Sequence, residues 1–308
     1  MSGIRRGVAV VVASAAALVM TVMSPGVAGA GLTGGPHTDG AVVATFPAGS
    51  FPESVALADG AAYVSLGFAG LVQRVTDGSP ASVTTVATVD VGDSTLLTGV
   101  AVLGDELFFT RASFAGDSWL YAVPLTAEGA TPSPVATFEN SFANGVAGRD
   151  GLLYVSDSHG GRVFTVDPVT HETTTWCQDA ALAGGKGVGI NGMAFRNGRL
   201  HAVVAATGQI VTMTRSRGAC TVTPVVRSNQ LVTGDGIAFG PDGLLYVTVN
   251  QFNKLVTVNL DTGRVDTVAA RTDGLSYPTQ AVFGNGVMYL SNGALANGAA
   301  TLMRFPLG

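Results

Sequence analysis

A unit of about 45 residues recurs six times along the chain, and this repeat constrains the fold more than any other feature of the sequence. Each copy has a polar residue, a small residue, a short apolar run, a turn pair and a second apolar strand. The copies are ESVALADGAAYVS, TGVAVLGDELFFT, NGVAGRDGLLYVS, NGMAFRNGRLHAV, DGIAFGPDGLLYV and TQAVFGNGVMYLS. Their first residues, which we call the anchors, are Glu53, Thr98, Asn144, Asn191, Asp235 and Thr279. Steps of about 45 residues are typical of a four-stranded propeller blade.

The turn pairs inside the repeat support an all-β fold. They are Asp59-Gly60, Gly104-Asp105, Asp150-Gly151, Asn197-Gly198, Asp242-Gly243 and Asn285-Gly286. Such pairs supply the positive φ angles that tight hairpins need. Two further strands follow in each unit, and no amphipathic helix is evident. The sequence therefore predicts a six-bladed β-propeller over residues 41–308, although a β-sandwich with chance internal similarity is the alternative.

The two ends of the repeat region predict how the ring closes. An outer strand precedes each anchor, and residues 41–49 (AVVATFPAG) match that strand although no blade comes before them. The last copy stops at Met303-Arg304-Phe305 and lacks its outer strand. Because an open ring would leave strand edges unpaired, we expect the N-terminal strand to complete the final blade.

The N-terminal segment reads as a secretory signal peptide over residues 1–30, followed by a short linker over 31–40. Arg5 and Arg6 precede an apolar run that is rich in Val and Ala, and Ala28-Gly29-Ala30 fits a cleavage site. The alternative is an uncleaved membrane anchor. We expect the mature chain to be secreted to the extracellular space, with no membrane contact after cleavage, and to be a monomer.

Composition argues against nucleic acid as a partner, and it leaves open whether the two cysteines are bonded. The formal net charge is −5 and only 12% of residues are charged, so no basic stripe is available to neutralise nucleic acid phosphates. The two cysteines are Cys177 and Cys220, which the repeat phase places in the outer strands of neighbouring blades. In an exported chain a disulfide is the default, but the spacing alone leaves them either bonded or free.

The anchors open the innermost strand of each blade, so all six should converge on one axis. Glu53, Asn144, Asn191 and Asp235 supply two carboxylates and two amides, which are hard oxygen ligands that suit Ca²⁺ or another divalent cation. Unpaired carboxylates in one channel would otherwise repel each other. The alternative is that each polar anchor satisfies loose backbone groups at a strand entry.

In these four residues the chain resembles the six-bladed calcium-dependent phosphotriesterase superfamily, in its gluconolactonase and regucalcin-like branch. Glu53 in FPES, Asn144 in ANG, Asn191 in INGMAF and Asp235 in GDGIAF match the order of its calcium ligands. The resemblance implies a calcium-dependent hydrolase of the lactonase or esterase type that acts on a small molecule. It further implies catalytic roles for Asp235, which would activate water or attack, and for Asn144 and Asn191, which would hold metal and substrate oxygen.

Loops on the face where the inner strands begin should wall a substrate pocket above the metal. Phe68, Phe114 and Phe252 are the expected apolar walls. The polar candidates for this pocket are Thr98, Thr279, Arg111, Asp157, His159, Asn250 and Asn292. Two other functions stay open at this point: a non-catalytic propeller similar to NHL repeat proteins, and a lyase similar to the streptogramin lyases.

Overall fold

The computed structural model describes residues 40–78, 80–295 and 298–307 of the 308-residue chain. The predicted signal peptide and nearly all of the predicted linker therefore lie outside the described residues. Among the described residues, no helix is both long and apolar enough to cross a membrane. The helices found in this part of the chain are five short 3-10 turns, which are η1 (Ala180–Leu182), η2 (Ala205–Thr207), η3 (Asn229–Leu231), η4 (Asn250–Phe252) and η5 (Arg271–Asp273).

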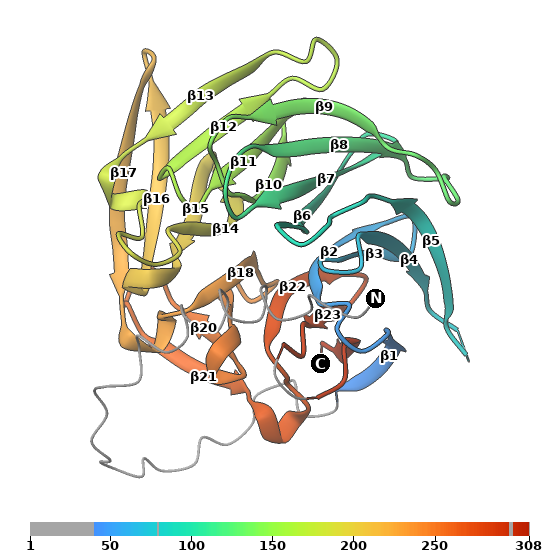
Figure 1. The fold of residues 1–308 in the computed structure, drawn as a ribbon. Coiled ribbons are helices and arrows are strands. Elements are labelled where there is room, and N and C mark those ends of the chain that lie inside the picture. Colours follow the sequence, from blue (N-terminus) through green and yellow to red (C-terminus); the bar gives the residue numbers. More distant parts are fainter. Residues whose placement is uncertain (1–39, 79, 296–297, 308) are drawn as a thin grey trace.

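The remaining structure is six antiparallel sheets of four strands each, arranged around one axis (Figure 1). Blades 1 to 3 are formed by β2 (Pro52–Ala58), β3 (Ala61–Leu66), β4 (Leu71–Thr76) and β5 (Ser82–Thr88), by β6 (Thr95–Leu103), β7 (Glu106–Ser113), β8 (Ser118–Pro124) and β9 (Ser133–Phe138), and by β10 (Ala143–Arg149), β11 (Leu152–Asp157), β12 (Arg162–Val166) and β13 (Thr173–Gln178). Blades 4 and 5 are formed by β14 (Ile190–Arg196), β15 (Arg199–Val204), β16 (Gln209–Ser216) and β17 (Ala219–Arg227), and by β18 (Gly234–Phe239), β19 (Leu245–Val249), β20 (Lys254–Val258) and β21 (Val265–Ala269).

Blade 6 combines the two ends of the propeller, as the missing outer strand predicts. It contains β22 (Pro278–Gly284), β23 (Val287–Asn292) and β24 (Thr301–Pro306), and its fourth strand is β1 (Ala41–Thr45). β1 pairs antiparallel with β24, from Ala41 opposite Arg304 to Thr45 opposite Thr301. In Figure 1 this is the blue strand beside the red C-terminal strands. Both the all-β propeller and its N-terminal closure are thus confirmed.

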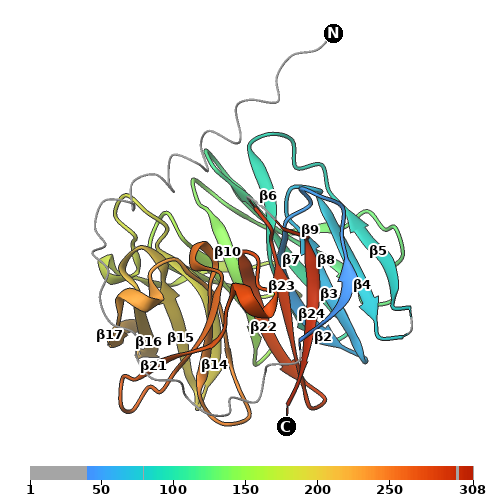
Figure 2. The same ribbon diagram turned by 90° about the horizontal axis from the view of Figure 1, so that it is seen from below.

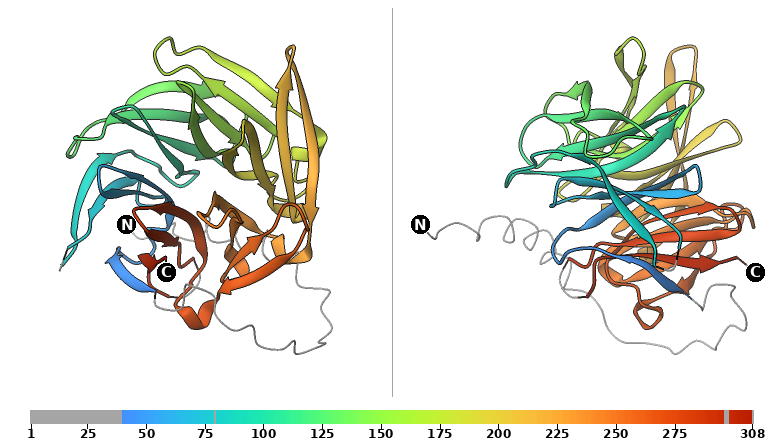
Figure 3. Two further views of the ribbon diagram at one scale, coloured as in Figure 1. Left: turned by 180° about the vertical axis from the view of Figure 1, so that it is seen from behind. Right: turned by 90° about the vertical axis from the view of Figure 1, so that its right-hand side faces the viewer.

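The hairpins between first and second strands explain the repeated turn pairs. Both residues of four pairs have positive φ: Asp59-Gly60, Asp150-Gly151, Asn197-Gly198 and Asn285-Gly286. Glycine, Asn and Asp tolerate this left-handed backbone better than other residues. The strands of each blade run between the same two faces of the ring (Figures 2 and 3). We call the face with these turns the hairpin face and the opposite one, where the inner strands begin, the anchor face.

Apolar clusters between neighbouring blades hold the ring together. Between blades 3 and 4, for example, Val163 from β12 packs in one cluster with Leu200 from β15 and Met213 from β16, and all three side chains are fully buried. Burying a side chain of this size stabilises the fold by about 1.5–3 kcal/mol.

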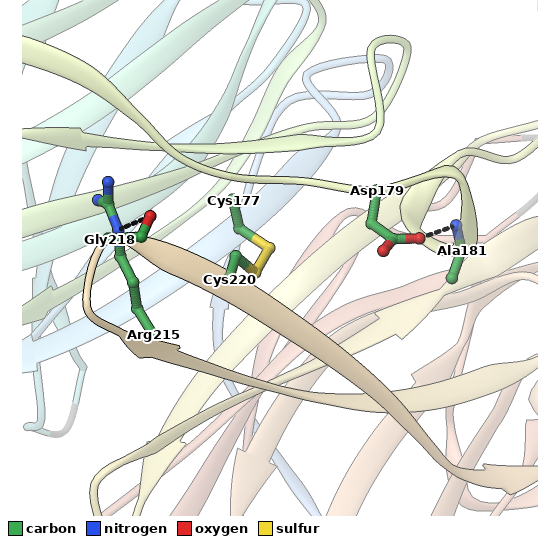
Figure 4. Close-up of a disulfide and its surroundings, with 6 residues drawn as sticks. All are labelled: Cys177, Asp179, Ala181, Arg215, Gly218 and Cys220. Carbon is green, nitrogen blue, oxygen red and sulfur yellow. Dashed lines mark hydrogen bonds between the residues drawn. A yellow bond between two sulfur atoms is a disulfide. The ribbon is translucent and has the colours of Figure 1, made fainter.

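A disulfide joins the outer edges of blades 3 and 4. Cys177 near the end of β13 is bonded to Cys220 near the start of β17, with Cα atoms 5.3 Å apart (Figure 4). The figure also shows the turn beside it, where Arg215 Nε donates a hydrogen bond to the carbonyl of Gly218. The two cysteines are therefore bonded, which their spacing in the sequence left open.

Candidate functional site

Each of the six inner strands carries an irregularity in its pairing at the anchor residue. In β10, Ala143 lies opposite Asp157 but Val146 lies opposite Val155, so Asn144 and Gly145 face the single residue Ser156. The same shift occurs at the other five anchors. A β-bulge of this kind re-aims a side chain away from the regular alternation of the sheet. Because the shift recurs at the same point of each inner strand, the six anchors have the same position in their blades.

The two anchor carboxylates are buried near each other. Glu53 is 9% exposed and Asp235 is 7% exposed. Burial raises the pKa of Glu53 well above its usual value, and the charge of Asp235 raises that pKa further. Burial also raises the pKa of Asp235 to about 7, although hydrogen bonds from Asn250 and Asn191 act in the opposite direction. Two ionised carboxylates are thus unfavourable here unless a cation compensates them.

The two anchor amides are held by hydrogen bonds that fix their orientation. Asn144 Nδ2 donates to Ser158 Oγ at 3.2 Å, and this hydroxyl donates in turn to the carbonyl of Ile190 at 2.6 Å. Asn191 hydrogen-bonds the Asp235 carboxylate. With its nitrogen engaged, the amide of Asn144 keeps its oxygen available as an acceptor or a metal ligand.

Asn250 connects the predicted pocket to the anchors. Its Nδ2 donates to Asp235 Oδ2 at 3.1 Å, and its Oδ1 accepts a hydrogen bond from the backbone of Gln251 at 2.6 Å. Metal-binding carboxylates are commonly held by outer partners of this type. Asn250 is therefore a positioning residue for Asp235.

The donor set of the four anchors fits a hard cation. It consists of two carboxylates and two amides, which match the all-oxygen coordination of calcium. Within the described ranges, no group of three or more His, Cys, Asp and Glu side chains is arranged to hold a metal.

Thr98 and Thr279 use their hydroxyls within the ring. Thr98 Oγ1 donates to the carbonyl of Ala143 at 2.8 Å, and Thr279 Oγ1 donates to the carbonyl of Pro52 at 2.9 Å. Both side chains are 1% exposed. These two anchors tie one blade to the next, and a role in substrate binding stays a prediction.

Glycine follows the anchor in four blades because the next blade approaches its backbone closely. A Cβ on Gly145 would lie 2.9 Å from the carbonyl oxygen of Asn191, and one on Gly192 would lie 2.5 Å from that of Asp235. Gly99 and Gly236 have similar close contacts with the following anchors. The anchor–glycine pairs are therefore not turn pairs, since each glycine lets two inner strands come together near the axis.

A hydroxyl on the second strand bonds across to the next anchor in four blades. The donors Ser65, Thr110, Ser156 and Thr248 bond the carbonyls of Thr98, Asn144, Asn191 and Thr279 at 2.7, 3.0, 2.9 and 2.7 Å. Blade 4 has Val203 at this position, before Asp235. The sequence did contain a signal for these bonds, because a Ser or Thr follows the apolar residues of the second strand in YVS, FFT and YVT.

Two of the remaining pocket candidates, Asp157 and Asn292, are held by local hydrogen bonds. Asp157 is fully buried, accepts backbone hydrogen bonds from Phe142, His159 and Gly160, and pairs with Arg162 at 2.6 Å. Asn292 is 1% exposed and donates to the carbonyl of Gly274. These contacts show that both residues hold their own turns.

Arg111 and His159 are placed differently. Arg111 Nε donates to Thr95 Oγ1 at 2.9 Å, and its guanidinium lies over the ring of Trp119 at 4.8 Å. His159 is exposed and its ring lies 5.1 Å from that of Phe142. Neither is shown to contact the four anchors, so their participation in a pocket stays a prediction.

Apolar residues lie two positions before the anchors in four blades, which sequence reasoning missed. They are Phe51, Leu96, Phe142 and Tyr277, and they belong to one cluster with Phe68 and Phe114. Phe51 stacks on Phe68 with ring centroids 4.9 Å apart. The predicted walls Phe68 and Phe114 are thus part of this cluster, whereas Phe252 is 46% exposed and outside it. We call this cluster the aromatic arc.

The arc brings a phenol close to the anchor carboxylates. Tyr277 is itself in a left-handed conformation, with φ of 54°. Burial raises the pKa of Tyr277, the charge of Asp235 raises it further, and the side chain of Gln251 hydrogen-bonds the phenol. In blades 4 and 5 the equivalent positions hold Gly189 and Thr233. The Thr233 hydroxyl is buried and has no hydrogen-bond partner among the described residues.

Comparison with known structures identifies the chain as a six-bladed β-propeller. No family description matches its sequence, and no curated protein is significantly similar. It resembles a luciferin-regenerating enzyme (12% identity, 84% of this chain and 92% of the other, TM-score 0.62). It also resembles the allergen Mala s 1 of Malassezia sympodialis (16%, 83% and 92%, 0.64) and a PQQ-bound aldose sugar dehydrogenase of Streptomyces coelicolor (15%, 88% and 99%, 0.61). At these identities the likeness concerns the fold alone.

Proposed function

We propose that this protein is an exported, calcium-dependent hydrolase of the lactonase or esterase type. The observation that carries the proposal is the buried pair of Glu53 and Asp235, whose carboxylates raise each other's cost of ionisation within one ring of oxygen donors. A cation bound by Glu53, Asn144, Asn191 and Asp235 would remove that cost. The disulfide between Cys177 and Cys220 supports export, because such bonds persist mainly in oxidising compartments.

Calcium bound by the four anchors would polarise the ester carbonyl and stabilise negative charge on its oxygen. The chain's own groups would do the rest. Asp235 is oriented by Asn250, so its carboxylate would be placed to accept a proton from an attacking water. The water oxygen would form a bond to the carbonyl carbon, and the bond from that carbon to the alkoxide oxygen would then break. The leaving alkoxide would take the proton from Asp235, which restores the carboxylate.

The aromatic arc favours an apolar or weakly polar acyl substrate. Phe51, Phe142 and Tyr277 crowd the entries of three inner strands, and contacts of this kind exclude water from a reaction centre. The raised pKa of Tyr277 keeps its phenol protonated, so it is suited to donate a hydrogen bond to a substrate oxygen. The unpartnered hydroxyl of Thr233 is a second polar group for the same purpose.

Calorimetry on the chelator-stripped mature chain tests the metal, and a lactone and aryl ester screen tests the reaction. We expect one calcium per chain, weakened at least tenfold in Asp235→Asn, with Asp105→Asn on the hairpin face as a matched control. Calcium-dependent hydrolysis supports the enzyme. Calcium binding without hydrolysis would favour a binding propeller, and absence of calcium binding would make the anchors a purely structural polar lining.

A further inference from the structure

A cavity of about 670 Å³ lies on the hairpin face, on the opposite side of the ring from the anchors. It opens between blades 4 and 5, at the turns after β14, β18 and β20. Its lining includes Arg196, Arg199, His201, Asp242, Asn259 and Asp261. A volume of this size is within the range of small-molecule sites, and it greatly exceeds the space that a bare inorganic anion needs.

Two guanidinium groups in this cavity lack a carboxylate partner. None of the ion pairs found in the described part of the chain involves Arg196 or Arg199. The Arg196 side chain is nonetheless fixed, because it donates to the carbonyl of Gly243 and its guanidinium lies over the ring of Phe239 at 4.9 Å. Arg199 is exposed at the start of β15. One guanidinium is thus pre-positioned and the other is free to close on a ligand.

The two carboxylates of the lining, Asp242 and Asp261, form no ion pair with these arginines. Asp242 Oδ1 accepts the backbone N–H of Leu244 at 3.1 Å, and its Oδ2 accepts the Tyr246 hydroxyl at 3.0 Å. Asp261 is exposed at the rim. Burial lowers the pKa of His201 to about 4, and the charges of Arg196 and Arg199 act in the same direction. The formal charges of the two arginines and the two aspartates thus balance, but Arg196 and Arg199 keep guanidinium N–H groups that no carboxylate of the described residues occupies.

The rest of the lining combines polar groups that can hydrogen-bond hydroxyls with the apolar side chains of Val225, Leu244 and Leu260. Asn197 offers an amide and Asp261 a carboxylate, whereas Asn259 offers only its Nδ2, because its Oδ1 accepts the backbone N–H groups of Asp261 and Thr262. Thr212 holds His201 through a 3.0 Å contact between Oγ1 and Nδ1. Amides and carboxylates that converge with two guanidinium groups suit a polyhydroxylated ligand with one anionic substituent. We propose that this cavity binds an anionic sugar, either a sugar acid or a sugar phosphate, through Arg196 and Arg199.

Binding should be visible at His201, which lines the cavity. An anion beside the two guanidinium groups offsets their field, so the pKa of His201 should rise on binding. Histidine resonances followed by NMR against pH would report this shift. The neutral imidazole also remains available to accept or donate one hydrogen bond to the ligand.

The test uses the full mature chain with galacturonate, glucose 6-phosphate, galactose and inorganic phosphate as separate probes. We expect at least one of the two anionic sugars to bind at least tenfold more tightly than both galactose and inorganic phosphate, and to raise the His201 pKa by about one unit. The two anionic arms distinguish a carboxylate from a phosphate ligand. Arg199→Gln should weaken binding at least tenfold, whereas Arg271→Gln on η5 should leave it unchanged.

Three outcomes would overturn the inference. They are equal binding of galactose, binding of inorganic phosphate as tight as that of both anionic sugars, and an unchanged affinity in Arg199→Gln. Asp235→Asn should not alter sugar binding, so failure of the anchor site as a metal centre leaves this test intact. Calcium titration in Arg199→Gln gives the reciprocal control.

Discussion

Asn250 donates a hydrogen bond from Nδ2 to Oδ2 of Asp235 across 3.1 Å, and so links a loop of the anchor face to an inner strand. This bond favours the ionised carboxylate and thereby lowers the Asp235 pKa, against the larger effect of burial. The two residues lie 15 positions apart in the chain, on either side of β19. Their contact brings together the bulge in β18 and the short helix η4.

Asn250→Ala should weaken calcium binding without unfolding the ring. Loss of the hydrogen bond raises the Asp235 pKa further and frees the carboxylate to rotate, so we expect a loss of about tenfold or more in affinity. Calorimetry on the chelator-stripped protein measures this change. Phe252→Ala in the same η4 helix is the control, because that side chain is exposed. Equal affinities in Asn250→Ala and the wild type would show that Asn250 does not position Asp235.

The close approach of inner strands makes Gly145 sensitive to substitution. A Cβ there would lie 2.9 Å from the carbonyl oxygen of Asn191, and the backbone must move to relieve this contact. We expect Gly145→Ala to lower the free energy of unfolding by about 1–3 kcal/mol. Gly148→Ala in the same strand is the matched control, since its nearest contact is 3.4 Å. Equal stabilities of the two variants in urea titrations would contradict the steric argument.

The sequence predicted the ring but not the contacts between its blades. Turn pairs and strand alternation are local signals, so six in-phase copies were enough to place β1 in the last blade. The bond from Ser156 to Asn191 and the approach of Gly145 depend on which residues of neighbouring blades meet. Which residues meet depends on the bulges at the anchors, and the local sequence pattern does not specify these. Asp157 and Asn292 show the same limit within one blade. Their position on the anchor face was predictable, but their local hydrogen bonds were not.

Blade 4 offers a test of the hydroxyls that bond across to the next anchor. Ser156→Ala removes a donor to the carbonyl of Asn191 and an acceptor for the N–H of Gly145. We expect a loss of about 1–3 kcal/mol in unfolding free energy, because buried backbone groups are left unpaired. Val203→Thr introduces the missing hydroxyl at the equivalent position and should stabilise the protein by about 1 kcal/mol. If Val203→Thr destabilises as much as Ser156→Ala, the hydroxyl pattern is not a general bond between blades.

The disulfide should matter for stability and not for the anchors. It closes a loop of 43 residues in sequence separation, for which loop-closure entropy corresponds to about 4 kcal/mol. Cys177→Ser with Cys220→Ser should therefore lower the melting temperature, while calcium affinity stays the same because the bond lies between outer strands. Reductant should lower the melting temperature of the wild type and not that of the double variant. A reductant effect on both proteins would place the sensitivity elsewhere.

His201 should make the fold less stable in mild acid. Its pKa is lowered from 6.5 to about 4 in the folded chain, by burial first and then by Arg196 and Arg199, while Asp242 and Asp261 line the same cavity. Between these two pH values the unfolded chain binds a proton that the folded chain does not, so stability falls as pH decreases from 6.5 towards 4. His201→Gln removes this difference. Urea titrations at several pH values should therefore show a stability gap between variant and wild type that changes across this window and is constant above pH 6.5. A gap that is constant down to pH 4 would mean that the folded protein protonates His201 as readily as the unfolded chain does.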